Sequence, residues 1–220
     1  MGYGYGACDA GYAALRFSHY GAALARVVDG AGGGLGWHRP ASTAGHPCPA
    51  VAGPPGALQK EQIAMRVHLA TDHAGMELSA HLLSHLTRAG HDVIDHGPTS
   101  YDPEDDYPSF CIDAAEAVVA DQAAGIEALG IVLGGSGNGE QIAANKVRGI
   151  RAALAWSLDT ARLARQHNDA NVVAVGGRQH SVDEATAIIE AFLAEPFSGA
   201  ERHSRRIAQV SRFEQTGSVA

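Results

Sequence analysis

The sequence is poor in cysteine, poor in basic residues and without a long apolar run, and each shortage excludes a class of protein. An odd number of cysteines without a CxxC pair argues against a disulfide framework and favours a reduced, cytoplasmic protein; they are Cys8, Cys48 and Cys111. Lysine and arginine number 16 against 24 acidic residues, and the net charge of −8 argues against a nucleic-acid partner. No apolar run is long enough to span a bilayer, so no membrane partner is expected.

Residues 1–64 differ in composition from the rest of the 220-residue chain. Glycines and a proline-rich stretch at 40–55 interrupt every hydrophobic periodicity, a composition typical of disordered segments. Met65 directly precedes a strand-like pattern, as a start codon would. The sequence therefore predicts that residues 1–64 are either a disordered or a non-native extension, and that residues 65–220 form one domain.

From Arg66 onward, strand and helix patterns alternate. Strands are predicted at residues 66–70, 91–95, 128–133, 151–156 and 171–175, and helices at 75–89, 107–121, 139–147, 159–166, 181–194 and 200–213. This alternation predicts an α/β fold with a parallel sheet covered by helices on both faces. Ligands bind such sheets beyond the carboxyl ends of the strands. The loops at 71–73, 134–140 and 176–178 each follow a strand, so we expect them to share one site.

The loop at residues 134–140 has the sequence Gly-Gly-Ser-Gly-Asn-Gly-Glu and joins an apolar run to a helix-like segment. Its four glycines allow backbone N–H groups to face an anion at a helix N-terminus. A dinucleotide fingerprint fails because Glu140 stands where its third glycine is needed, and a P-loop fails because no lysine follows Gly139. A carboxylate repels phosphate but can remove a proton beside a developing oxyanion, so the loop is predicted to be catalytic.

Five motifs occur in order and together carry a family resemblance. They are Thr71-Asp72-His73-Ala74-Gly75, the 134–140 loop, Ile142-Ala143-Ala144-Asn145-Lys146, His167-Asn168 and Gly176-Gly177-Arg178. Residues 65–215 resemble the type B ribose-5-phosphate isomerases, a family that includes galactose-6-phosphate isomerase subunits. The resemblance implies a Rossmann-like three-layer α/β/α sandwich with a five-stranded parallel sheet. It also implies a phosphorylated sugar as substrate, a homodimer with shared active sites, and no metal or organic cofactor.

The chain departs from the commoner family pattern at two linked positions. Many members carry a cysteine, thought to be the catalytic base, where this chain has Gly134, and an apolar residue where it has Glu140. The chain resembles the other branch, in which the glutamate is the base. Cys111 lies within a helix-like segment and is expected to be a core residue.

The resemblance implies aldose–ketose isomerisation, in which a proton moves between C1 and C2 through an enediolate. Such a reaction needs a base and donors for the oxyanion. Glu140 is the expected base, although a first-turn glutamate can also simply stabilise the helix dipole. Ser136 is expected to hold the oxyanion and can also cap the helix. The neighbouring groups expected to bind substrate are Gly135, Gly137, Asn138 and Gly139.

Other residues are assigned to ring opening and to the sugar hydroxyls. By resemblance, His167 opens the furanose ring, and an ordinary histidine pKa of about 6.5 suits that proton exchange. Asp72 is expected to hydrogen-bond to substrate hydroxyls or to the ring, and Asn168 to bind a hydroxyl. The alternatives are a helix C-terminal cation for His167 and a helix stop for Asn168.

A phosphate group needs local positive charge in this acidic chain. Arg202 and Arg206 are four residues apart on the last predicted helix, so they share one face. Arg178 and His73 each follow a strand. A solvated basic face would be the simplest interpretation of the arginine pair, but the resemblance implies that both reach into the partner subunit's site. His81 and His85 share a helix face without a carboxylate that completes a zinc motif, so structural or surface roles are expected.

The leading hypothesis is an isomerase that interconverts ribose 5-phosphate and ribulose 5-phosphate. A second hypothesis keeps the mechanism with a six-carbon substrate, such as allose or galactose 6-phosphate. A third is a sugar-phosphate-binding module without catalysis. The presence of Ser136, Glu140 and His167 together argues against the third, because binding alone needs only the arginines and glycines.

Overall fold

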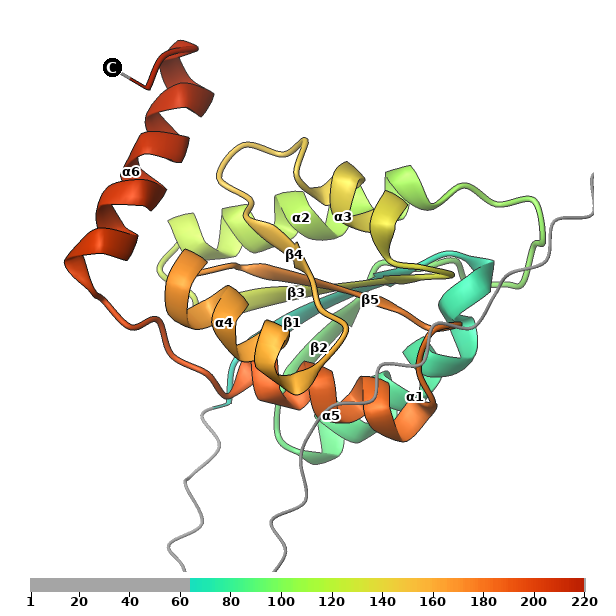
Figure 1. The fold of residues 1–220 in the computed structure, drawn as a ribbon. Helices are drawn as coiled ribbons and strands as arrows, with labels where there is room; N and C mark the ends of the chain where they lie inside the picture. Colours follow the sequence, from blue (N-terminus) through green and yellow to red (C-terminus); the bar gives the residue numbers. More distant parts are fainter. Residues whose placement is uncertain (1–63, 220) are drawn as a thin grey trace, which may run out of the picture. The chain divides into compact units, whose positions relative to one another are not determined.

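The computed structural model describes residues 64–219, and the predicted extension at 1–64 therefore lies almost entirely outside the described residues. Strands and helices alternate along the chain (Figure 1). The strands are β1 (Arg66–Thr71), β2 (Asp92–Asp95), β3 (Ala128–Gly134), β4 (Ala152–Leu154) and β5 (Val172–Gly176). The helices are α1 (Met76–Arg88), α2 (Tyr107–Ala123), α3 (Asn138–Ala144), α4 (Leu158–Asn168), α5 (Val182–Leu193) and α6 (Glu201–Thr216), and a short 3-10 helix, η1 (His73–Gly75), precedes α1.

The five strands form one parallel sheet in the order β2-β1-β3-β5-β4, which confirms the predicted fold class. The chain runs outward from β1 to β2 and then returns to the other side of β1 at β3. The strand order therefore reverses between β1 and β3, the place where open α/β sheets bind ligands. Thr71 is in register with Leu133, and Gly134 with Gly176, so these three strands end at the same edge.

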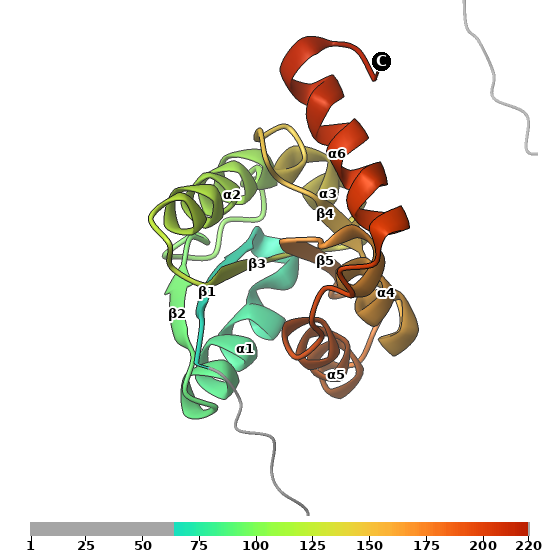
Figure 2. The ribbon, with the colours of Figure 1, turned by 90° about the vertical axis from the view of Figure 1, so that its left-hand side faces the viewer.

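Helices cover both faces of the sheet (Figure 2). One apolar core joins the sheet to α1, α4 and α5, and a second joins it to α2 and α3. The apolar run of β3 is buried along its whole length because the strand is central and covered on both faces. The three-layer sandwich predicted from the resemblance is thus confirmed.

Of the helix boundaries that differ from the prediction, two have a clear local reason. The helix predicted from residue 75 begins at Met76, after η1, whose first turn is capped by the Asp72 side chain. The helix predicted to continue to Val147 ends at Ala144. There the Asn145 side chain pairs with both backbone groups of Ala152 in β4, at 2.9 Å for each bond, and so ties the helix end to the sheet.

Helix α6 stands apart from the sandwich (Figures 1 and 2). It meets α4 near its beginning, and further along Glu214 accepts a hydrogen bond from the backbone N–H of Gly149 at 3.0 Å. Val210 and Phe213 are 61% and 57% exposed. Within residues 64–219, no helix combines the length and apolarity needed to cross a bilayer.

Replacing Phe192 with alanine is expected to destabilise the fold by about 3–5 kcal/mol, because it leaves a large cavity in a core with little room to relax. The Phe192 ring on α5 is fully buried in the core under α1 and α4. Urea denaturation at fixed protein concentration measures the change. Ile126→Ala, at a residue 38% exposed, is the control and should shift the midpoint far less. Equal shifts for the two variants would contradict the proposed core.

Candidate active site

The loops that follow β1, β3 and β5 meet at the carboxyl edge of the sheet. The backbone N–H of Gly177 donates to the carbonyl of Gly134 at 2.8 Å, and that of Arg178 donates to Gly135 at 3.2 Å. Gly177 also lies against Gly75, at the start of α1. The structure therefore brings together the predicted residues of all three loops. These are Asp72, His73, Gly135, Ser136, Gly137, Asn138, Gly139, Glu140 and Arg178.

The turn between β3 and α3 depends on a glycine at position 137. Gly137 is the N-cap of α3 and has a left-handed backbone, with φ +80°. A Cβ there would also approach the backbone of Val175 and Gly176 to 3.0 and 3.1 Å. Only glycine meets both conditions without strain. The start of α3 can therefore rest directly on β5.

Ser136 lies exposed at the opening of this turn. Its Oγ accepts hydrogen bonds from the backbone N–H of Asn138 at 3.4 Å and from the Asn138 side chain at 3.3 Å. Gly137 rather than Ser136 is the N-cap of α3, and no side chain caps it, so the capping alternative for Ser136 is not met. The two long bonds leave the hydroxyl proton of Ser136 available. Ser136 and Asn138 also border a hollow of about 470 Å³, lined on its other side by Trp156 and His180. A small ligand has room beside the loop.

Glu140 is only 5% exposed, although it stands in the first turn of a short helix. Its side chain turns back over the end of β3, where a Cβ on Gly134 would overlap the Glu140 carboxyl. Burial raises the pKa of Glu140, and the nearby charge of Asp72 raises it further, while backbone N–H groups of the loop oppose the shift. A glutamate that served only the helix dipole would be solvated. The geometry is that of a desolvated carboxylate.

Asp72 and Cys111 complete the surroundings of Glu140. Asp72 is 6% exposed and accepts a hydrogen bond from the backbone N–H of Ala74 at 2.9 Å. Cys111 is fully buried on α2, which confirms that it is a core residue. Burial and then the charges of Glu140 and Asp72 raise the pKa of the Cys111 thiol to about 12. The thiol therefore stays protonated, which leaves the carboxylates as the candidate bases at this edge.

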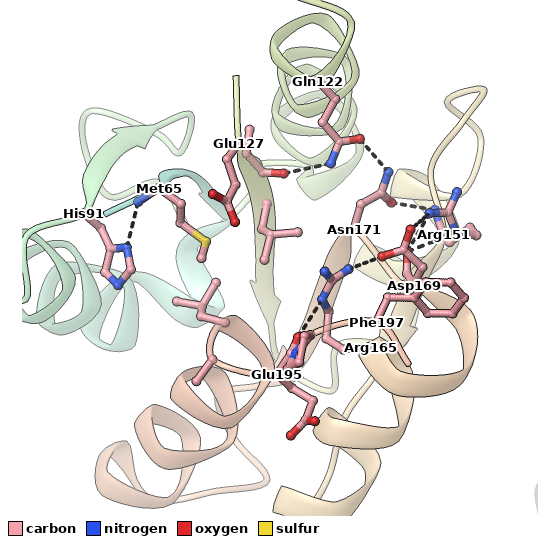
Figure 3. Close-up of a pocket in the computed structure, with 15 residues that line it drawn as sticks. Met65, His91, Gln122, Glu127, Arg151, Arg165, Asp169, Asn171, Glu195 and Phe197 are labelled. Carbon is pink, nitrogen blue, oxygen red and sulfur yellow. Dashed lines mark hydrogen bonds and ion pairs between the residues drawn. The ribbon is translucent and has the colours of Figure 1, made fainter. Parts of the chain in front are cut away.

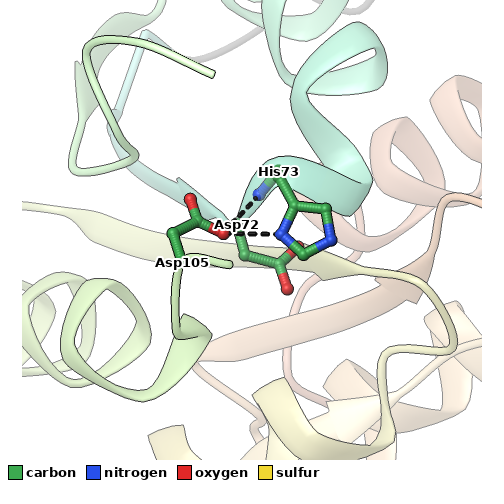
Figure 4. Close-up of side chains that lie close together, drawn as sticks. All are labelled: Asp72, His73 and Asp105. Carbon is green, nitrogen blue, oxygen red and sulfur yellow. Dashed lines mark hydrogen bonds and ion pairs between the residues drawn. The ribbon is translucent and has the colours of Figure 1, made fainter. Parts of the chain in front are cut away.

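His73 is held by a residue that the sequence analysis missed, Asp105 (Figure 4). Asp105 Oδ1 accepts from the His73 backbone N–H at 3.0 Å and from its Nδ1–H at 2.6 Å. Nδ1 therefore carries a proton, and Nε2 is left for a ligand. The side-chain atoms of Asp72, His73 and Asp105 that could bind a metal ion lie within 4.8 Å of one another. However, His73 and Asp105 already bind each other. The signal for Asp105 was its place in the acidic loop after β2.

Replacing Glu140 with glutamine is expected to raise the melting temperature, because it removes a charge that burial disfavours. In the folded state the pKa of Glu140 lies above the ordinary value of 4.5. The protonated carboxyl therefore contributes to the free energy of unfolding at low pH, and this contribution is lost as pH rises through the folded-state pKa. The advantage of Glu140→Gln over wild type should grow as pH rises above the ordinary value of 4.5 and level off above the folded-state pKa, so the melts span about pH 4 to pH 8. Thermal melts across this range measure it, with Glu116→Gln, an exposed site on α2, as control. A pH-independent difference would contradict the assigned pKa direction.

The other predicted residues lie at the opposite edge of the sheet. His167 and Asn168 end α4, and β5 begins shortly after them at Val172, whereas the glycine-rich loop follows the carboxyl end of the neighbouring β3. A strand as long as β5 separates the two edges by roughly 15 Å. Arg202 and Arg206 are exposed on α6, which meets α4. One chain therefore does not bring these four residues to Glu140.

His81 and His85 behave as expected for surface residues. Their rings stack with centroids 5.7 Å apart, and His85 Nε2–H donates to Glu190 Oε1 of α5 at 2.7 Å. This pair links two helices on the outside of the sandwich, away from the three loops.

A cavity of about 770 Å³ also lies at the amino edge, between the ends of α2, α4 and α5 (Figure 3). Much of its polar wall is internally paired: Asp169 accepts from Arg165 at 2.8 Å and from Arg151 at 3.1 Å, and Asn171 donates to Gln122 at 3.2 Å. No residue predicted to be functional lines it. The carboxyl edge, with its clustered loops and buried carboxylate, is the better candidate for catalysis.

The chain is similar to known proteins of one family. A family model described as Ribose/Galactose Isomerase matches residues 67–210. A ribose-5-phosphate isomerase B from Mycolicibacterium paratuberculosis is 57% identical over 152 residues, covering 69% of this chain and 93% of the relative. One from Escherichia coli is 37% identical over 150 residues, covering 68% and 97%.

A solved structure extends the likeness to three dimensions. The ribose-5-phosphate isomerase B of Mycoplasma genitalium, determined with bound ribulose 5-phosphate, is 39% identical with a TM-score of 0.65. The match covers 69% of this chain and 97% of that one. The chain belongs to the ribose/galactose isomerase family.

Proposed function

We propose that this protein is an aldose–ketose isomerase that interconverts D-ribose 5-phosphate and D-ribulose 5-phosphate. The observation that carries the proposal is the buried carboxylate of Glu140 at the end of a glycine-rich loop, in the first turn of α3. The names of the relatives support this substrate, and the ribulose 5-phosphate bound in the Mycoplasma genitalium structure supports it further.

In the proposed reaction, Glu140 removes the proton from C2 of the open-chain aldose and returns it to C1. The electron pair moves to the carbonyl oxygen O1 and gives an enediolate. Ser136 and the backbone N–H groups at the start of α3 donate to that oxygen, where negative charge develops. As C1 takes up the proton, the proton of the O2 hydroxyl passes to O1, which leaves a carbonyl at C2 and a hydroxyl at C1. A desolvated glutamate is a stronger base than a solvated one, because the neutral product of proton transfer is favoured by burial.

We further propose that a second copy of the chain completes each site. His167 and Asn168 of the second copy would open the ring and bind a hydroxyl, and its Arg202 and Arg206 would bind the phosphate together with Arg178 and His73. The separation of these residues from Glu140 within one chain supports this arrangement. The exposed apolar side chains Trp156, Val210 and Phe213 support it too, because a homodimer would cover such surface.

The first test is formation of ribulose 5-phosphate from ribose 5-phosphate in the presence of EDTA. The full chain and a shortened chain that begins at Met65 should both turn over. Allose 6-phosphate, offered in parallel, should be the poorer substrate. Absence of turnover by a folded protein would overturn the proposed reaction, and preference for the six-carbon sugar would reassign the substrate.

Mixing two inactive variants tests the shared site. Glu140→Gln and His167→Asn are each expected to be nearly inactive alone. After subunit exchange, the mixed dimer has one intact site of two, and the population should recover about a quarter of wild-type activity. A mixture that stays inactive, although exchange is seen with differently tagged chains, would place the whole site within one chain.

A further inference from the structure

A buried histidine joins α6 to the end of α4. Within α6, every residue of which is described, His203 alone is buried, at 4% exposure. Its ring centroid lies 4.3 Å from that of His167. Its Nε2 accepts a hydrogen bond from Arg202 Nε at 2.9 Å, and its Nδ1 lies 3.0 Å from Ser198 Oγ. One side chain therefore contacts two residues that the proposed function assigns to ring opening and to phosphate binding.

These contacts define the protonation state of His203. The arginine Nε–H can only donate, so Nε2 of His203 must be unprotonated. Nδ1 then carries the proton and donates to Ser198 Oγ. Burial lowers the pKa of His203, and nearby His167, Arg202 and Arg206 lower it further against a smaller opposing contribution from the Gln166 carbonyl. Geometry and electrostatics agree on a neutral ring.

We infer that His203 is a positioning residue that holds Arg202 and His167 in one preassembled unit. Anchoring Arg202 through Nε leaves both terminal nitrogens of the guanidinium free for two phosphate oxygens. It also orders a long, exposed side chain before the ligand arrives, which lowers the entropy cost of binding. The inference rests on the proposed function, because it assumes that Arg202 binds the phosphate of the substrate.

Two amide replacements of His203 distinguish a role in positioning Arg202 from a role in packing alone. Glutamine at 203 places an oxygen near the Nε2 position and can still accept from Arg202, whereas asparagine can reach only toward Ser198. His203→Asn is expected to raise KM for ribose 5-phosphate by roughly 10-fold, the loss of about one hydrogen bond to a charged group. kcat should change less, and His203→Gln should recover most of the KM. Equal KM values in the two variants, whether raised or unchanged, would overturn the inference.

His91→Asn is the matched control. His91 is also buried, at 5% exposure, and accepts a hydrogen bond at Nδ1, here from the Met65 backbone N–H, but it contacts none of the proposed site residues. It should lower stability and leave KM unchanged. A similar rise in KM for this variant would show that general loosening, rather than the contact with Arg202, produces the effect.

A double-mutant cycle tests the route of the effect. In an Arg202→Ala background, His203→Asn should no longer raise KM, because the group that it positions is gone. A KM penalty that persists in this background would contradict action through Arg202.

Nitrogen-15 NMR of the histidine side chains in wild-type protein gives a readout independent of turnover. The expected His203 tautomer is protonated at Nδ1 and unprotonated at Nε2, and the opposite tautomer would overturn the inference. If ribose 5-phosphate is not isomerised but this tautomer is seen, the proposed function fails while the contact between His203 and Arg202 stands. Poor folding of a variant would not affect this measurement.

Discussion

Glu140→Gln is expected to lower kcat for ribose 5-phosphate by roughly 10²–10⁴-fold, the usual contribution of a general base. Glutamine keeps the size of the buried side chain but cannot accept the C2 proton. Because the carboxylate contacts the reacting carbon rather than the phosphate in the proposed site, KM should change only a few fold. Steady-state kinetics with separate kcat and KM measure the split.

Thermal stabilisation by ribose 5-phosphate is the control for Glu140→Gln. The inactive variant should still bind the sugar phosphate, so its melting temperature should rise on adding ligand as it does in wild type. Residual kcat within about tenfold of wild type would contradict the role of Glu140 as base. Asp72, the other buried carboxylate at this edge, would then become the candidate.

Gly134→Ala is expected to lower kcat by roughly 100-fold, although it adds a single methyl group. That methyl would occupy the space of the Glu140 carboxyl, which would have to swing away from the reacting carbon. Displacement of a catalytic group by about 1 Å can cost 100-fold in rate. Gly90→Ala is the matched control: it strains a left-handed glycine, φ +95°, where nothing lies within 4 Å, and should cost stability without lowering kcat.

The same overlap fits the pattern that the family resemblance implies, in which members carry either a cysteine at the position of Gly134 or a glutamate at that of Glu140. A side chain at position 134 and the Glu140 carboxyl would compete for one place. The double variant Gly134→Cys/Glu140→Val should therefore exceed each single variant by about tenfold or more in kcat, because a thiol can enter the vacated space and act as base. A double variant no better than the singles would show that the two positions do not share a catalytic role.

Two residues that organise the proposed site, Asp105 and His203, were missed from the sequence. Asp105 binds His73, 32 residues away, and His203 contacts His167 on another helix. Neither belongs to a local motif, and an aspartate in an acidic loop or a histidine in a basic helix is ordinary in sequence. Their roles depend on contacts between distant segments, which hydrophobic periodicity does not encode.

The sequence by itself determined the alternation of strands and helices, the parallel sheet, and the edge at which the glycine loop and Asp72 meet. These follow from local periodicity and from the rule that loops after parallel strands share one edge. Only the tertiary structure decided that Glu140 is buried over Gly134, and that His167 and Arg202 lie at the far edge of the same chain. Burial and separation depend on how α3, α4 and α6 pack, because a helix pattern specifies an apolar face but not the neighbour that covers it.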